Sequence, residues 1–145
     1  MLVMVGLVGV LASCEGGGGG FSLGGVTFLN ADISGWAETA TVAVSLSSSS
    51  VTLDSDKKSV WPDKQDVNAC AWVVFQVDGT WYAATFDYMR PGQTTKQIGG
   101  LEIKGPGLRW KPSSGEKVGF IISGLARDSR RNVSERSPVY FETWP

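Results

Sequence analysis

From Phe21 onward, apolar and polar residues alternate in short runs that are separated by Gly, Pro, Asp and Ser. Alternation with a period of two is typical of strands that bury one face, and no stretch shows a sustained helical period. The pattern predicts strands near residues 26–33, 39–47, 50–54, 70–78, 80–88, 95–103, 117–125 and 137–144. About eight short strands joined by turns predict an all-β fold, an antiparallel β-sandwich.

The clearest element is a hairpin around Asp78-Gly79, a dipeptide that favours a two-residue type I′ turn. Such a turn pairs Val77 with Thr80. The same register, continued along both strands, pairs Ala71 with Phe86. The register predicts one core face, which carries Ala71, Val73, Phe75, Val77, Tyr82, Ala84 and Phe86.

The opposite face of this hairpin is mixed, with Trp72, Gln76, Trp81 and Asp87 among its residues. Aromatic rings that cover the C–H face of a sugar, beside amide and carboxylate groups that bond its hydroxyls, are typical of polysaccharide-binding surfaces. The register places the two Trp about four residues, or ~14 Å, apart, which suits an extended sugar chain. Alternatively, a loop or the chain's own ends cover this face, and its aromatic residues only stabilise the sheet, which is their more common role.

Residues 1–13 are uncharged and apolar, too short a run to span a bilayer of ~30 Å as a helix, and typical of a signal peptide. The run lacks the Lys or Arg that usually opens such a peptide. It ends in Leu11-Ala12-Ser13-Cys14, which resembles the lipobox of bacterial lipoproteins. The resemblance implies cleavage before Cys14, attachment of Cys14 to membrane lipid, and a place in the bacterial cell envelope. Glu15, rather than Asp, favours the outer membrane or cell surface.

Glycine is concentrated at this end of the chain, because nine of the 19 glycines lie in the first 25 residues. We therefore expect residues 14–25 to form a tether between the lipid and a domain over 26–145. The alternatives are a buried N-terminal strand or a secreted protein with a Cys14–Cys70 disulfide. If Cys14 carries lipid, Cys70 is left as a single thiol, and its apolar neighbours predict a small buried residue.

The C-terminal third resembles the end of a fibronectin type III or related immunoglobulin-like domain. The pattern over about 30 residues is carried by Ala126, Asp128, Asn132, Ser134 and Ser137. The resemblance implies an immunoglobulin-like sandwich.

The loop over 127–136 is rich in arginine. Guanidinium groups suit carboxylate or phosphate ligands, so Arg127, Arg130 and Arg131 are candidates for binding an acidic partner. Asp128 and Glu135 lie in the same loop, and the alternative is that they pair with these Arg and brace it.

Composition excludes several function classes. With 13 Lys and Arg against 14 Asp and Glu, the net charge of −1 excludes nucleic-acid binding by bulk electrostatics. The chain has no His, which excludes His-dependent triads and His–metal sites within it, and we expect no metal or cofactor. We expect a non-catalytic envelope lipoprotein that binds polysaccharide; hydrolysis by paired carboxylates is a further hypothesis. The alternative is a structural or adhesion domain that binds an envelope protein through strand edges or the Arg loop.

Overall fold

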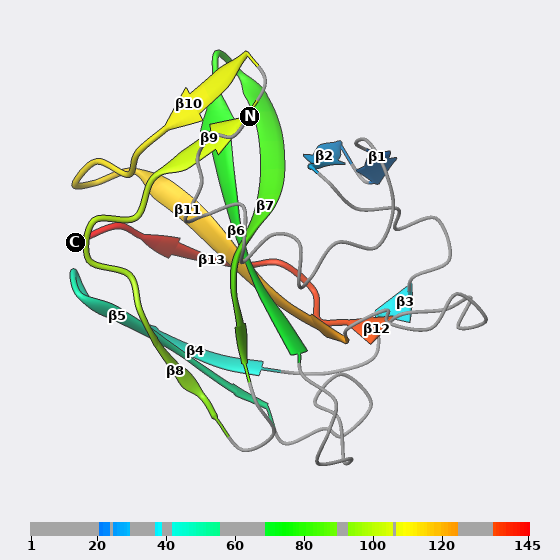
Figure 1. Cartoon of the computed structure of the whole chain (residues 1–145), viewed down its shortest axis with the longest axis vertical. Helices are drawn as coiled ribbons and strands as arrows, with labels where there is room; N and C mark the ends of the chain where they lie inside the picture. Colours follow the sequence, from blue (N-terminus) through cyan, green and yellow to red (C-terminus); the bar gives the residue numbers. More distant parts are fainter. Residues whose placement is uncertain are drawn as a thin grey trace.

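The computed structural model describes residues 21–23, 25–29, 37–38, 42–55, 69–89, 93–105, 107–124 and 135–145 (Figure 1). All regular secondary structure in these ranges is β, which confirms the predicted all-β sandwich. The strands are shorter and more numerous than expected, and several have only two or three residues. Within the described ranges, no helix is long and apolar enough to cross a membrane.

The first layer is an eight-stranded sheet. Its strands, in spatial order, are β1 (Phe21–Leu23), β2 (Val26–Phe28), β7 (Thr80–Met89), β6 (Ala69–Val77), β11 (Lys117–Gly124), β12 (Glu135–Arg136) and β3 (Ala37–Glu38), with β13 (Tyr140–Thr143) also paired to β11. The pairs β2–β7 and β12–β3 are parallel, whereas the other strand pairs in the described part of this sheet are antiparallel.

The second layer comprises two smaller sheets. One contains β4 (Val42–Leu46), β5 (Ser50–Ser55) and β8 (Thr95–Gln97), and the other pairs β9 (Ile103–Gly105) with β10 (Leu108–Trp110). The serine run between β4 and β5 forms a tight turn, as expected, because Ser47 Oγ accepts hydrogen bonds from the backbone N–H of Ser49 and of Ser50.

A hydrophobic core fills the space between the layers. The inner face of β6 contributes Phe75, whose ring stacks on that of Trp110 from β10 with centroids 4.4 Å apart. Val51 and Leu53 from β5 pack into the same core with Phe120 from β11. Period-two alternation on each strand supplies these residues, so each strand delivers one apolar face to the core.

The β6–β7 hairpin has the predicted turn. Asp78 and Gly79 both have positive φ, 51° and 82°, as a type I′ turn requires. Val77 pairs with Thr80, and the predicted register holds until a bulge between Ala71 and Trp72. Beyond the bulge the register shifts by one residue, and Ala71 lies opposite Asp87 rather than the predicted Phe86. The predicted core face is nevertheless confirmed, since all seven of its residues lie in or against the core.

Candidate functional site

The outer face of the β6–β7 hairpin, which points away from the second layer, was the predicted ligand surface. Trp72 on this face is fully buried, with 0% of its surface exposed, and its Nε1 donates a hydrogen bond of 2.8 Å to Ser123 Oγ. The ring of Phe28 meets it edge-on, with centroids 5.4 Å apart. The prediction that Trp72 binds a ligand was therefore wrong, because a buried ring cannot contact a sugar.

The cover over Trp72 comes from the chain itself, as the alternative interpretation held. Val26 and Phe28 of β2 lie on this face because β2 extends the sheet beside β7, with Phe28 opposite Ala83. Val139, just before β13, packs on the same cluster. Segments from both ends of the domain thus close this part of the outer face and form a second core.

The end of this face near the hairpin turn remains accessible. Gln76 is exposed, Trp81 is half-buried, and the two are direct cross-strand partners. Trp81 meets the ring of Phe141 from β13 edge-on, with centroids 5.3 Å apart and planes inclined by 66°. Phe141 is 40% exposed, the one large apolar side chain in the described part of the chain with that much exposure.

Gly119 on β11 explains how Phe141 reaches Trp81 across the sheet. A Cβ at this position would lie 2.6 Å from Val139 Cγ1 and 3.1 Å from Phe141 Cε1, so the absence of a side chain leaves the space that both residues use. Two residues earlier, Lys117 places its Nζ 4.7 Å from the centroid of the Phe141 ring, a cation–π contact. We call Gln76, Trp81, Lys117 and Phe141 the outer patch.

Asp87 does not belong to the outer patch. The bulge shifts its register by one residue, and its carboxylate pairs with Lys96 Nζ of β8 at 2.8 Å. The ion pair therefore links β7 to the second layer, and the predicted position of Asp87 beside Trp72 and Trp81 was wrong.

The Arg-rich loop falls mostly outside the described residues, including its three candidate ligands Arg127, Arg130 and Arg131. Arg136, the last arginine of this run, is only 7% exposed, and its Nη1 donates a hydrogen bond of 2.9 Å to the backbone oxygen of Ser137. Its guanidinium carbon lies 5.9 Å from the centroid of the Phe28 ring. Arg136 thus packs against the second core, a structural role.

Cys70 is 1% exposed, which confirms the prediction of a small buried residue. It is disulfide-bonded, rather than the single thiol that lipid on Cys14 would leave. The sequence contains one further cysteine, Cys14, which lies outside the described residues.

Sequence reasoning missed Phe141 and Lys117. The alternation over residues 139–144 was a usable signal, because it places Phe141 on the face opposite the core residue Trp144. Across the described ranges, no three potential metal-ligating side chains lie together. No family model, no curated protein and no solved structure matches this chain.

Proposed function

We propose that this protein is a lipid-anchored, non-catalytic domain of the bacterial cell envelope that binds polysaccharide through the outer patch. The supporting observation is the pair formed by Trp81 and Phe141, two accessible rings beside an exposed amide and an exposed ammonium group. Aromatic rings contact the C–H face of a sugar, while Gln76 and Lys117 supply hydrogen bonds to its hydroxyls.

The geometry of the patch limits how much ligand it contacts. The ring centroids of Trp81 and Phe141 are only 5.3 Å apart, against the ~14 Å expected for two Trp on neighbouring strands. The planes are also inclined by 66°, so the rings do not form one flat platform. We therefore propose contact with a single sugar unit of the chain rather than with a long stretch of it.

A glycan array tests this proposal. Phe141→Ala and Gln76→Ala should each lose binding, whereas Gln97→Ala, an exposed glutamine on β8 of the other layer, should bind as the wild type does. Gln97→Ala is the matched control because it removes the same exposed amide from a different sheet. Equal glycan binding by all three variants would rule out the outer patch.

The lipid anchor rests on the resemblance of residues 11–14 to a lipobox. The disulfide-bonded state of Cys70 favours the competing hypothesis, a secreted protein with a Cys14–Cys70 disulfide. One sulfur cannot carry both bonds, so the two hypotheses exclude each other. Palmitate labelling of wild type, Cys14→Ser and Cys70→Ser separates them. An anchor predicts label in wild type and Cys70→Ser only, and absence of label from the wild type would refute it.

A further inference from the structure

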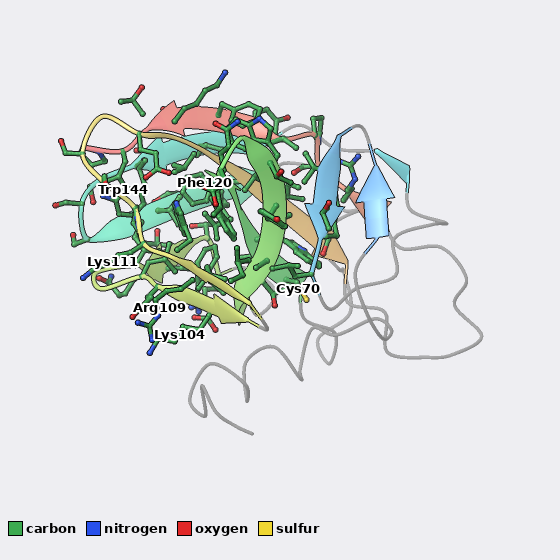
Figure 2. The ribbon with its side chains drawn as sticks, turned by 90° about the horizontal axis from the view of Figure 1, so that it is seen from above. Cys70, Lys104, Arg109, Lys111, Phe120 and Trp144 are labelled. Carbon is green, nitrogen blue, oxygen red and sulfur yellow. The ribbon has the colours of Figure 1, made fainter. Side chains whose placement is uncertain are left out.

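The β9–β10 hairpin carries a charged surface that is separate from the outer patch. Lys104 and Arg109 are direct cross-strand partners, so both side chains leave the same face of the hairpin. Lys111 is exposed just beyond β10, and Figure 2 shows the three cations together at the end of the molecule formed by this hairpin. Trp110 packs this hairpin on the inner face of β6, whereas the outer patch lies on the opposite face.

The fold does not require this arrangement of charges. On the other face of the hairpin, Ile103 pairs with Trp110 and both are buried in the core, which fixes the register. Like charges placed directly opposite each other destabilise a strand pair. A neutral residue in place of Lys104 or Arg109 would remove that repulsion without changing the core, so the fold needs neither charge.

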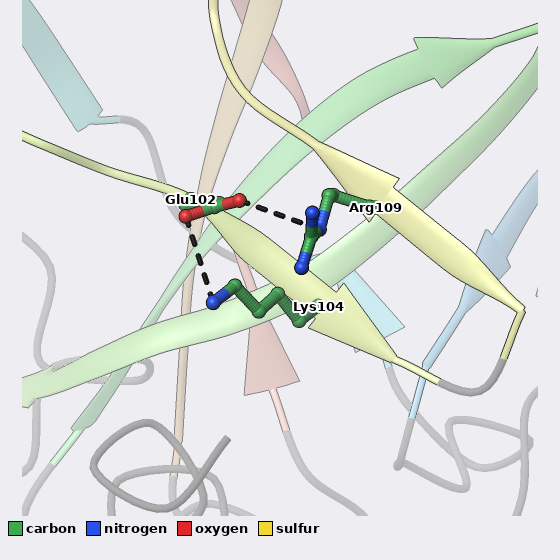
Figure 3. Close-up of polar contacts among 3 residues, drawn as sticks. All are labelled: Glu102, Lys104 and Arg109. Atoms are coloured by element: carbon green, nitrogen blue, oxygen red, sulfur yellow. Dashed lines mark ion pairs between the residues drawn. The ribbon is translucent and has the colours of Figure 1, made fainter. Parts of the chain in front are cut away.

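The carboxylate of Glu102 lies between Lys104 and Arg109 and faces both (Figure 3). Its oxygens lie 3.8 Å from Lys104 Nζ and 3.6 Å from Arg109 Nε. Both distances exceed those of hydrogen bonds, and the Arg109 side chain is 72% exposed, so the contacts are weak. Glu102 nevertheless shows that a carboxylate fits between the two cations.

We propose that this cluster binds the carboxylates of an acidic polysaccharide, which displace Glu102. The planar guanidinium of Arg109 suits a bidentate contact with a carboxylate, while Lys104 and Lys111 act as point charges. A cluster of three cations suits a polymer that carries single, widely spaced charges. Duplex DNA carries one charge per ~1.7 Å and calls for a larger basic surface than a chain of net charge −1 offers. The site does not depend on the outer patch.

Polygalacturonate, a linear polyuronate, is the probe, and its fully methyl-esterified form is the matched neutral ligand. Calorimetry on the full chain should detect binding to the acid form only, and this binding should weaken as salt rises. Arg109→Gln and Lys104→Gln should each weaken binding about tenfold, the loss expected for one charge-assisted hydrogen bond. Circular dichroism of each variant checks that the fold is retained.

Glu102→Gln provides the sharper test, because it should improve binding. Removal of the displaced carboxylate should tighten binding roughly two- to fivefold, the worth of an exposed ion pair. Glu142→Gln removes the same charge from β13, which belongs to a different sheet, and should change little. Glu102→Gln that binds no more tightly than Glu142→Gln would overturn the proposal, as would tighter binding to duplex DNA or anionic vesicles than to polygalacturonate. Neither result bears on the outer patch, which the Phe141 variant tests.

Discussion

Replacement of Gly119 by alanine should destabilise the protein and disrupt the outer patch together. The added Cβ would lie 2.6 Å from Val139 Cγ1 and 3.1 Å from both Phe141 Cε1 and Val74 Cβ. Separations under 3.0 Å do not occur for real Cβ atoms, so the Val139 side chain must move. Val74 belongs to the fully buried second core and has no free space, so the displacement falls on Val139 and Phe141.

The size of the effect follows from two opposing contributions. One extra methyl group in a packed site costs about 1–3 kcal/mol of unfolding free energy. Replacement of Gly by Ala also restricts the backbone of the unfolded chain, which stabilises the folded protein by about 0.4–1 kcal/mol. The net loss for Gly119→Ala is therefore about 1–2 kcal/mol, which lowers Tm by roughly 2–8 °C at this chain length.

Urea unfolding, followed by tryptophan fluorescence, measures the free energy. Gly105→Ala is the matched control, because a Cβ there has no heavy atom within 4 Å and the site is also in a strand. We expect Gly105→Ala to be as stable as the wild type or slightly more stable. Equal stability of Gly119→Ala and Gly105→Ala would refute the claim that Gly119 makes room for Val139 and Phe141.

Two further substitutions test polar contacts, one between neighbouring strands of the first sheet and one between the two layers. Ser123→Ala should cost about 1–3 kcal/mol in urea unfolding, because it leaves the buried Nε1 of Trp72 without its acceptor; unchanged stability would contradict this. Asp87→Asn should cost about 1 kcal/mol, because it removes the 2.8 Å ion pair with the largely buried Lys96. The loss should be smaller when both proteins are unfolded in high salt, and a salt-independent difference would count against an electrostatic origin.

The local parts of the fold were predictable from the sequence. The turn at Asp78-Gly79 and the register next to it depend on turn chemistry and a period of two, which neighbouring residues specify. The single strand expected over 95–103 is instead divided into β8 and β9 by a turn at Gly99-Gly100, where Gly100 has a φ of 78°. The Gly-Gly pair was the available signal for that break.

The composition of the candidate site was less predictable, because it depends on contacts between distant segments. Apolar residues recur at every second position up to Phe86, so the sequence did not reveal the bulge that changes the partner of Asp87. The burial of Trp72 depends on Phe28, which comes much earlier in the chain. Trp72 and Val73 make both faces of β6 apolar. The alternation of residues does not indicate which segment covers the outer face.

The position of the outer patch follows from where that cover ends. Phe28 and Val139 lie over the part of the sheet that contains Trp72 and Val74, and they bury it. Toward the hairpin turn the residues of this face become Gln76 and Lys117, both exposed. Phe141 lies where this cover ends, so its ring has packed neighbours on one side and solvent on the other. Such a ring is held in place and still accessible, which a binding surface requires and which neither a buried Trp nor a freely rotating surface residue provides.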